Sequence, residues 1–207
     1  MSALRKNLIP MAAAIVAVWV GIHPGTLSAQ TSGVGCDGYT RLLWRGTDSS
    51  SILWNLDPSL NYVGASSVYG PYIGWIPVSI AVGCDDYTRL LWKDTDGTAG
   101  LWLLSPTLVY VNSTFYGPYS GWLPESLSID PYHPDYLRLI WKKTNGEVAV
   151  WILDPNLNFV TSQFYGPYFG WDAGTASAAP HKSTTPKEAE AAAAMNARHT
   201  NSNPMPR

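Results

Sequence analysis

The chain has 207 residues, of which 13% are aromatic and only 14% are charged, with ten tryptophans against four phenylalanines. About a quarter of the residues in a folded protein are usually charged, so this composition excludes a highly charged disordered chain. The formal net charge of −2 disfavours a nucleic-acid-binding protein, because such proteins neutralise phosphates with an excess of Lys and Arg.

The first 29 residues have the three-part pattern of a secretory signal peptide. Arg5 and Lys6 are basic, residues 8–22 are mostly apolar, and the segment ends on the small residues Ser28 and Ala29. The apolar run is shorter than the roughly 20 residues that span a bilayer, which disfavours the alternative of an uncleaved anchor. We therefore predict a secreted, periplasmic or cell-surface protein with no membrane span after leader cleavage.

Loss of the leader would remove two basic residues and no acidic ones, leaving 11 against 15 and a net charge of −4. Residues 34–172 alone hold 7 basic and 13 acidic residues, a net charge of −6. This acidic balance predicts no binding to nucleic acids or anionic lipid surfaces.

Residues 34–172 contain three copies of one unit, at about residues 34–81, 82–129 and 130–172. All nine tryptophans outside the leader fall into three columns, and chance does not place them in register. The columns are Trp44, Trp92 and Trp141; Trp54, Trp102 and Trp151; and Trp75, Trp122 and Trp171.

Each copy predicts short strands and no helix. The segments TRLLW and ILWNL of the first copy are apolar and aromatic, and Thr-Asp-Ser, Thr-Asp-Gly or Thr-Asn-Gly stands between such segments as a hairpin signal. A proline such as Pro58 then ends pairing, and the YGPY segment predicts a turn. Another strand, residues 76–82 in the first copy, follows the GW pair.

Residues 173–207 are rich in Ala, Ser, Thr, Pro and Asn and have no apolar stripe. We predict a disordered tail or linker there.

The strands favour propeller-like blades. Residues 41–44 and 148–153 are apolar without clean alternation, which predicts sheets covered on both faces, as neighbouring blades would provide. We predict an all-β fold of three tandem four-stranded β-propeller-like blades, with a β-trefoil as the alternative. Closed propellers have four or more blades, so two chains joined into a homo-oligomeric ring of six are an expected partnership.

The unit DG-YTRLLWRGTD-SSSILWNLD, followed by a GW pair and VSIAVG, resembles the bacterial integrin-type (FG-GAP or VCBS-like) propeller repeat. It is also broadly similar to the Trp-rich repeats of propeller lectins. The resemblance covers residues 34–172 and implies blades. Integrin-type repeats usually have a calcium loop, but these loops supply one or two carboxylates each, and calcium takes six to eight oxygens. We therefore predict no metal and no cofactor.

One column holds Cys36, Cys84 and His133. Three readings remain open for it. The residues could form a zinc site, the two cysteines could form a disulfide in an oxidising compartment, or the column could hold two thiols and a surface histidine.

Another column holds Arg41, Arg89 and Arg138, each two residues after a tyrosine. Such an arginine could bind a ligand carboxylate with two hydrogen bonds. The favoured reading is a structural brace, paired with the recurring Asp48 or Asp96 or with another blade residue.

The YGPY-x-GW segments are the best ligand candidates, because rigid aromatic rings pack against sugar faces. We expect the tyrosines to be exposed and the Trp44 column to be core, and the third tryptophan column is undecided. The candidate residues are Tyr69, Tyr72 and Trp75; Tyr116, Tyr119 and Trp122; and Tyr165, Tyr168 and Trp171.

Nothing in the mature chain resembles a nucleophile elbow, a metalloprotease helix, a P-loop or a dinucleotide loop. We therefore predict a non-enzymatic, secreted binding module. The first hypothesis is carbohydrate binding in the manner of a lectin, with glycans as partners of up to three equivalent sites. The alternative is a structural or protein–protein interaction repeat domain of the cell envelope, which predicts that the YGPY tyrosines are buried.

Overall fold

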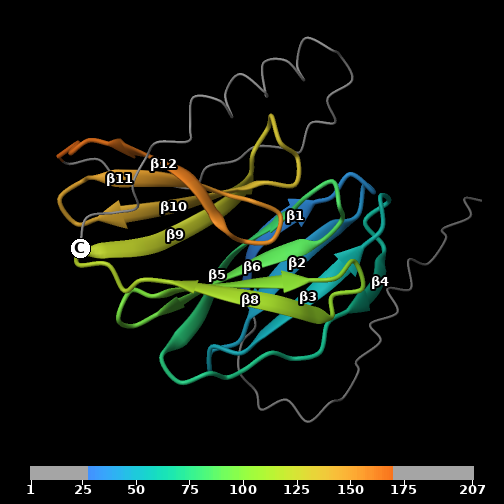
Figure 1. The fold of residues 1–207 in the computed structure, drawn as a ribbon. Helices are drawn as coiled ribbons and strands as arrows, with labels where there is room; N and C mark the ends of the chain where they lie inside the picture. Colours follow the sequence, from blue (N-terminus) through green and yellow to red (C-terminus); the bar gives the residue numbers. More distant parts are fainter. Residues whose placement is uncertain (1–27, 170–207) are drawn as a thin grey trace, which may run out of the picture.

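The computed structural model describes residues 28–169, which form twelve strands in three four-stranded antiparallel sheets (Figure 1). The first sheet contains β1 (Ser28–Val34), β2 (Thr40–Arg45), β3 (Ser51–Leu56) and β4 (Tyr62–Ala65). The second contains β5 (Trp75–Val82), β6 (Thr88–Asp94), β7 (Ala99–Leu104) and β8 (Tyr110–Tyr116). The third contains β9 (Trp122–Ile129), β10 (Leu137–Lys143), β11 (Val148–Leu153) and β12 (Phe159–Tyr165).

Each sheet has its own hydrogen-bond ladder and its strands follow one another in chain order. This arrangement confirms the all-β prediction and corresponds to three blades rather than to a β-trefoil. None of the elements between residues 28 and 169 is a helix that could cross a membrane.

The sequence units and the blades are offset by one strand. The strand expected at residues 76–82 pairs with β6, so it is the first strand of the second blade and not the last strand of the first. The first blade likewise begins with β1 at Ser28, ahead of the first sequence unit. The remainder of the predicted leader and the predicted tail at residues 173–207 lie outside the described residues.

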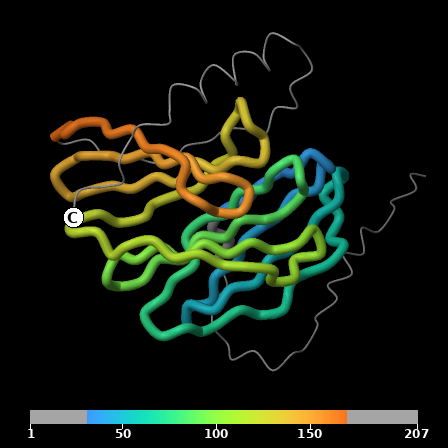
Figure 2. The backbone as a smooth tube through the Cα atoms, viewed as in Figure 1, coloured from blue at the N-terminus to red at the C-terminus, as the bar shows by residue number. Residues whose placement is uncertain are grey.

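The blades stack in chain order through their first strands. β1 lies beside β5, and β5 lies beside β9. The second blade is therefore between the other two, and the first and third blades form the ends of an arc (Figure 2).

The predicted hairpin turns occur between the second and third strands of each blade. The third turn residue is Ser49, Gly97 or Gly146, with φ angles of 68°, 91° and 84°. Glycine adopts such angles without steric cost, which explains its presence in two of the three turns.

Apolar side chains fill both spaces between blades. Leu43 and Leu53 of the first blade share a core with Trp92 of the second. Leu101 of the second blade shares the other core with Trp141 of the third. The second blade is thus covered on both faces, as the irregular apolar pattern predicted.

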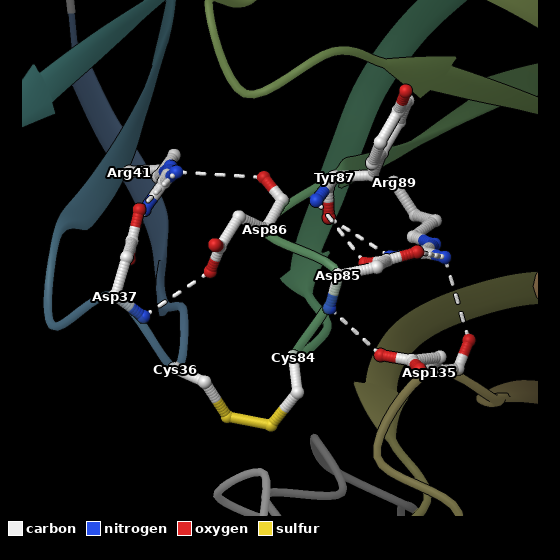
Figure 3. A network of polar contacts seen from close by, with 9 residues as sticks. All are labelled: Cys36, Asp37, Arg41, Cys84, Asp85, Asp86, Tyr87, Arg89 and Asp135. Atoms are coloured by element: carbon white, nitrogen blue, oxygen red, sulfur yellow. Dashed lines mark hydrogen bonds and ion pairs between the residues drawn. A yellow bond between two sulfur atoms is a disulfide. The ribbon is translucent and has the colours of Figure 1, made fainter.

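A disulfide joins Cys36 to Cys84, with 4.6 Å between the Cα atoms (Figure 3). This bond settles the three readings of that column, because neither sulfur is free as a thiolate ligand. His133, the third member, lies instead beside Asp130 and Tyr136.

The disulfide links loops that are 48 residues apart, so it restricts the unfolded chain. We expect the double substitution Cys36→Ala and Cys84→Ala to lower the free energy of unfolding by about 2–4 kcal/mol. Urea unfolding of the variant and of the oxidised protein checks this. An unchanged midpoint, also after reduction of the native chain, would show that the loops are held without the bond.

Candidate functional site

The Arg column braces neighbouring blades near the disulfide (Figure 3). Arg41 is buried and donates two hydrogen bonds of 2.8 Å to the carboxylate of Asp37. It also donates to the backbone oxygen of Asp86 in the next blade. The backbone N–H of Asp37 in turn donates to the Asp86 carboxylate at 3.1 Å.

The same network recurs between the second and third blades. Arg89 is buried and donates to both carboxylate oxygens of Asp85, and one of its nitrogens donates to the backbone oxygen of Asp135. The N–H of Asp85 donates to the Asp135 carboxylate at 2.8 Å. Bidentate contact with a carboxylate fixes the guanidinium plane, so both arginines hold loops in place.

Arg138 differs because it has no following blade. Pro134 occupies the place of Asp37 and Asp85, so Arg138 pairs with Asp130 at 3.3 Å. Its side chain remains 30% exposed, against 1% and 0% for Arg41 and Arg89. The brace reading thus describes Arg41 and Arg89, although their partners are Asp37 and Asp85 and not Asp48 or Asp96. Their enclosed guanidinium groups leave no room for a ligand carboxylate.

The second YGPY tyrosine packs at the edge of the space between blades. The ring of Tyr72 lies 5.4 Å from that of Trp92 and 5.6 Å from that of Trp102, both in the next blade. Tyr119 repeats this contact with the two strand tryptophans of the third blade, at 5.4 and 5.6 Å. Tilted and edge-to-face aromatic pairs of this kind contribute about 0.5–1.5 kcal/mol beyond their buried area.

The first YGPY tyrosine makes a directed contact with the next blade. The phenol of Tyr69 donates a hydrogen bond of 2.7 Å to the backbone oxygen of Leu108, and that of Tyr116 donates one of 2.7 Å to Leu157. Burial raises the pKa of Tyr116 to about 12 and, in direction, that of Tyr69 as well. The prediction that the YGPY tyrosines are exposed was therefore wrong for Tyr69, Tyr116 and Tyr119, because the following blade covers them. It was right for Tyr72, Tyr165 and Tyr168, of which Tyr72 is 41% exposed.

The burial of the tryptophans also depends on whether a neighbouring blade covers them. Trp92 and Trp141 are buried, as predicted for the first column, whereas Trp44 is only half-buried. In the third column Trp122 is buried and Trp75 half-buried against the core, and Trp171 lies outside the described residues. No tryptophan of residues 28–169 is classed as exposed.

The first blade has an uncovered tryptophan face, which we define as Trp44, Trp54 and Leu60. In the next two blades the corresponding leucines, Leu108 and Leu157, are 3% and 0% exposed because a tyrosine lies against them. Leu60 is 67% exposed. An apolar side chain that is core in two copies is at the surface in the first.

The third blade has the complementary uncovered tyrosine face, which we define as Tyr165 and Tyr168. Tyr165 is 48% exposed. Its counterparts Tyr69 and Tyr116 are half-buried, and their phenols donate hydrogen bonds to the next blade. Val150 is also partly exposed, although the equivalent Leu53 and Leu101 are fully buried. The predicted residues Tyr165 and Tyr168 are thus exposed on the third blade. The other four YGPY tyrosines contact the blade that follows them.

Sequence reasoning missed the leucine column of Leu60, Leu108 and Leu157, as well as the carboxylates that hold the arginines. The signal was available, since each leucine stands two residues after a turn proline, where polar residues are usual. Only the contact with the preceding blade reveals its role.

No known family model matches the chain, and no curated protein resembles it in sequence. The resemblance to integrin-type and lectin repeats therefore stays a prediction. Among solved structures, a GH43 glycoside hydrolase with an engineered active site is 12% identical over 75% of this chain and 34% of its own, with a TM-score of 0.49. The WD40 domain of SCAP from fission yeast is 14% identical over 68% and 33%, with a TM-score of 0.39.

A protein of unknown function from Bacteroides caccae is 8% identical over 66% of this chain and 46% of its own, with a TM-score of 0.40. This chain thus spans less than half the length of each of these three proteins. At such identities the likenesses concern the fold and say nothing of a ligand or partner.

Two substitutions in the Arg column test whether the buried arginines stabilise the junctions between blades. We expect Arg89→Met to lower the free energy of unfolding by about 3 kcal/mol, because it removes a fully buried partner of a paired carboxylate. Arg138→Met removes an arginine that is 30% exposed, and its buried partner Asp130 also accepts two backbone N–H bonds, so this change should cost less, about 1 kcal/mol. Denaturant unfolding of both variants checks this, and equal effects would contradict the assigned brace.

The buried phenol generates a pH dependence. A tyrosine with a raised folded pKa stabilises the fold fully below its unfolded pKa of 10.0, and this contribution is lost as the pH rises towards about 12. We expect Tyr116→Phe to lower stability by about 1 kcal/mol at neutral pH and to lose less further stability than the native chain between about pH 9 and 11. The exposed Tyr132→Phe is the control, and parallel pH profiles of native chain and Tyr116→Phe would refute the assignment.

Proposed function

We propose that the domain is a non-enzymatic protein-binding module that recognises its partner through the two uncovered blade faces. The observation that carries this proposal is the exposure of Leu60, 67% against 3% and 0% for its counterparts in the covered blades. The face that contains it keeps the paired tryptophans of an inner blade, with ring centroids of Trp44 and Trp54 only 4.8 Å apart.

The residues that contribute most to protein–protein binding are often aromatic side chains with apolar neighbours, and this face has both. End repeats of repeat proteins usually have a polar outer face, which keeps them soluble and unpartnered. Here both end faces keep the aromatic residues that join blades within the chain. Such faces fit another protein surface, and a β-blade most directly.

We further propose that the module acts outside the cytoplasm, on the cell surface, in the periplasm or in the medium. The Cys36–Cys84 disulfide supports this, because such bonds persist in oxidising compartments. The pattern of the first 29 residues agrees with export.

Glycan binding is the second candidate function. Tyr168 is the observation that favours it, because its ring is 57% exposed and would offer a flat platform to a sugar. The three equivalent sites expected from the repeat are reduced, since Tyr69 and Tyr116 bind the next blade. Lectin-like binding would therefore centre on the third copy.

Photo-crosslinking in cells that naturally produce the chain tests protein binding. We expect Leu60→p-benzoylphenylalanine to form covalent adducts with protein on illumination. The matched control is the same replacement at Ile73, which is likewise apolar and exposed but lies outside both faces. Equal or absent adducts at the two positions would refute the uncovered faces as protein-binding sites.

A glycan array and polysaccharide affinity gels with the full chain separate the second candidate. We expect no retention if protein is the ligand class. Retention that Tyr168→Ala abolishes would replace the protein-binding proposal with the lectin-like one.

A further inference from the structure

We propose that the partner is a second copy of this chain, and that two copies close a six-bladed ring, each placing its tyrosine face on the tryptophan face of the other. This inference rests on the proposed protein-binding function and names its partner. The pattern of contacts that would join the copies is already present twice within one chain.

The two internal junctions have the same tyrosine contacts. In both, a phenol donates a 2.7 Å hydrogen bond to a leucine backbone oxygen, and a second tyrosine lies 5.4 and 5.6 Å from two tryptophans. A junction therefore needs one tyrosine face and one tryptophan face. The chain has one of each left over, on the first and third blades, which form the ends of the arc (Figure 2).

The turn at Leu60 is already in the conformation that accepts a tyrosine. Its φ of 64° matches the 62° of Leu108 and the 70° of Leu157. The N–H of Leu60 donates to the backbone oxygen of Asp57 at 2.8 Å, and the equivalent bonds of Leu108 and Leu157 are 2.8 and 2.9 Å. The Leu60 backbone oxygen is thus set in the turn geometry of the two that bind Tyr69 and Tyr116, and Tyr165 is the phenol left to fill it.

The first strands of the blades also repeat a contact across each junction. The hydroxyl of Thr31 accepts a hydrogen bond from the N–H of Ile80 in the next blade, and that of Ser79 accepts one from Leu127. Ser126 has the third place in this series. Its hydroxyl is buried and has no hydrogen-bond partner among residues 28–169.

The backbone N–H that corresponds to those of Ile80 and Leu127 is that of Ser32 in β1, which pairs with Leu42 as Ile80 pairs with Leu90. A buried polar group without a partner costs free energy. A second copy whose β1 lay against β9 would place this N–H in the same series, next to a Ser126 hydroxyl that is already buried in the single chain.

The number of blades fixes the number of copies. Propellers usually close with four to eight blades. One chain supplies three, and three chains would supply nine, so two copies are the whole number that falls in this range. The contact joins two unlike faces, so copies could also add in an open chain. The ring closes only if the free face of the second copy meets the free face of the first.

The junction between copies would lack part of the internal network. Within the chain, the N–H of Asp85 binds the carboxylate of Asp135. At the ends, Pro134 has no N–H in the place of Asp85, and Gly38 has no carboxylate in the place of Asp135. We therefore expect a reversible dimer, held by aromatic contacts and weaker than the joints within the chain.

Sedimentation velocity of the full chain tests the ring from about 1 to 100 µM. We expect a monomer–dimer equilibrium without larger species. Tyr165→Ala with Tyr168→Ala in one variant, and Leu60→Asp in another, should each raise the dissociation constant at least about tenfold. Ile73→Asp, a charge at an exposed apolar residue off both faces, should leave it unchanged.

Mixing gives the sharper result. The tyrosine-face variant and the Leu60→Asp variant should each stay monomeric alone but form a one-to-one heterodimer, because one intact junction remains between them. Circular dichroism and thermal unfolding, unchanged by these surface substitutions, show that all variants are folded.

A chain that stays monomeric throughout, or that forms a ladder of larger species, overturns the ring. Crosslinks from position 60 to a different protein, with a monomeric chain, overturn this inference and leave the proposed function standing. The loss of crosslinks at position 60 together with a monomer would refute both.

Discussion

The fold depends on a contact in which a tyrosine of one blade enters the pair of tryptophans of the next. Burial of apolar area does not by itself fix the relative position of two sheets, because the hydrophobic effect is non-directional and roughly proportional to the buried area. The phenol of Tyr69, which donates to the Leu108 backbone oxygen, adds the missing direction. Together with the bonds of the polar brace, this hydrogen bond fixes the position of one blade along the next.

This constraint explains why the ends of the arc are the interesting part of the molecule. A contact that needs unlike faces always leaves one of each uncovered. The inner loops of the end blades have changed, with Pro134 and Gly38 in place of the bracing aspartates, but Tyr165, Tyr168, Trp44 and Trp54 remain as in the inner positions. The residues that make the aromatic contact are therefore present at both ends, where the residues of the polar brace are incomplete.

The polar brace joins the loops that follow the first strands of neighbouring blades, and in the first junction the disulfide joins the same loops (Figure 3). Aromatic packing and buried ion pairs thus act at different places on the same interface. The first junction has the disulfide in addition, and the second has instead a backbone bond from Cys84 to Pro134. The chain is most firmly joined between its first two blades.

The repeat, the strands, the hairpin turns and the burial of Trp92 and Trp141 could be predicted from the amino-acid sequence, because they follow from local propensity and from the regular spacing of like residues. The sequence also showed Arg41 as a brace, but not that Asp37 is its partner. The different exposures of Tyr69 and Tyr165, and of Leu60 and Leu108, were decided only by the tertiary structure. Near-identical residues differ there because a neighbouring blade is present at one and absent at the other, and no local pattern records what lies against a surface.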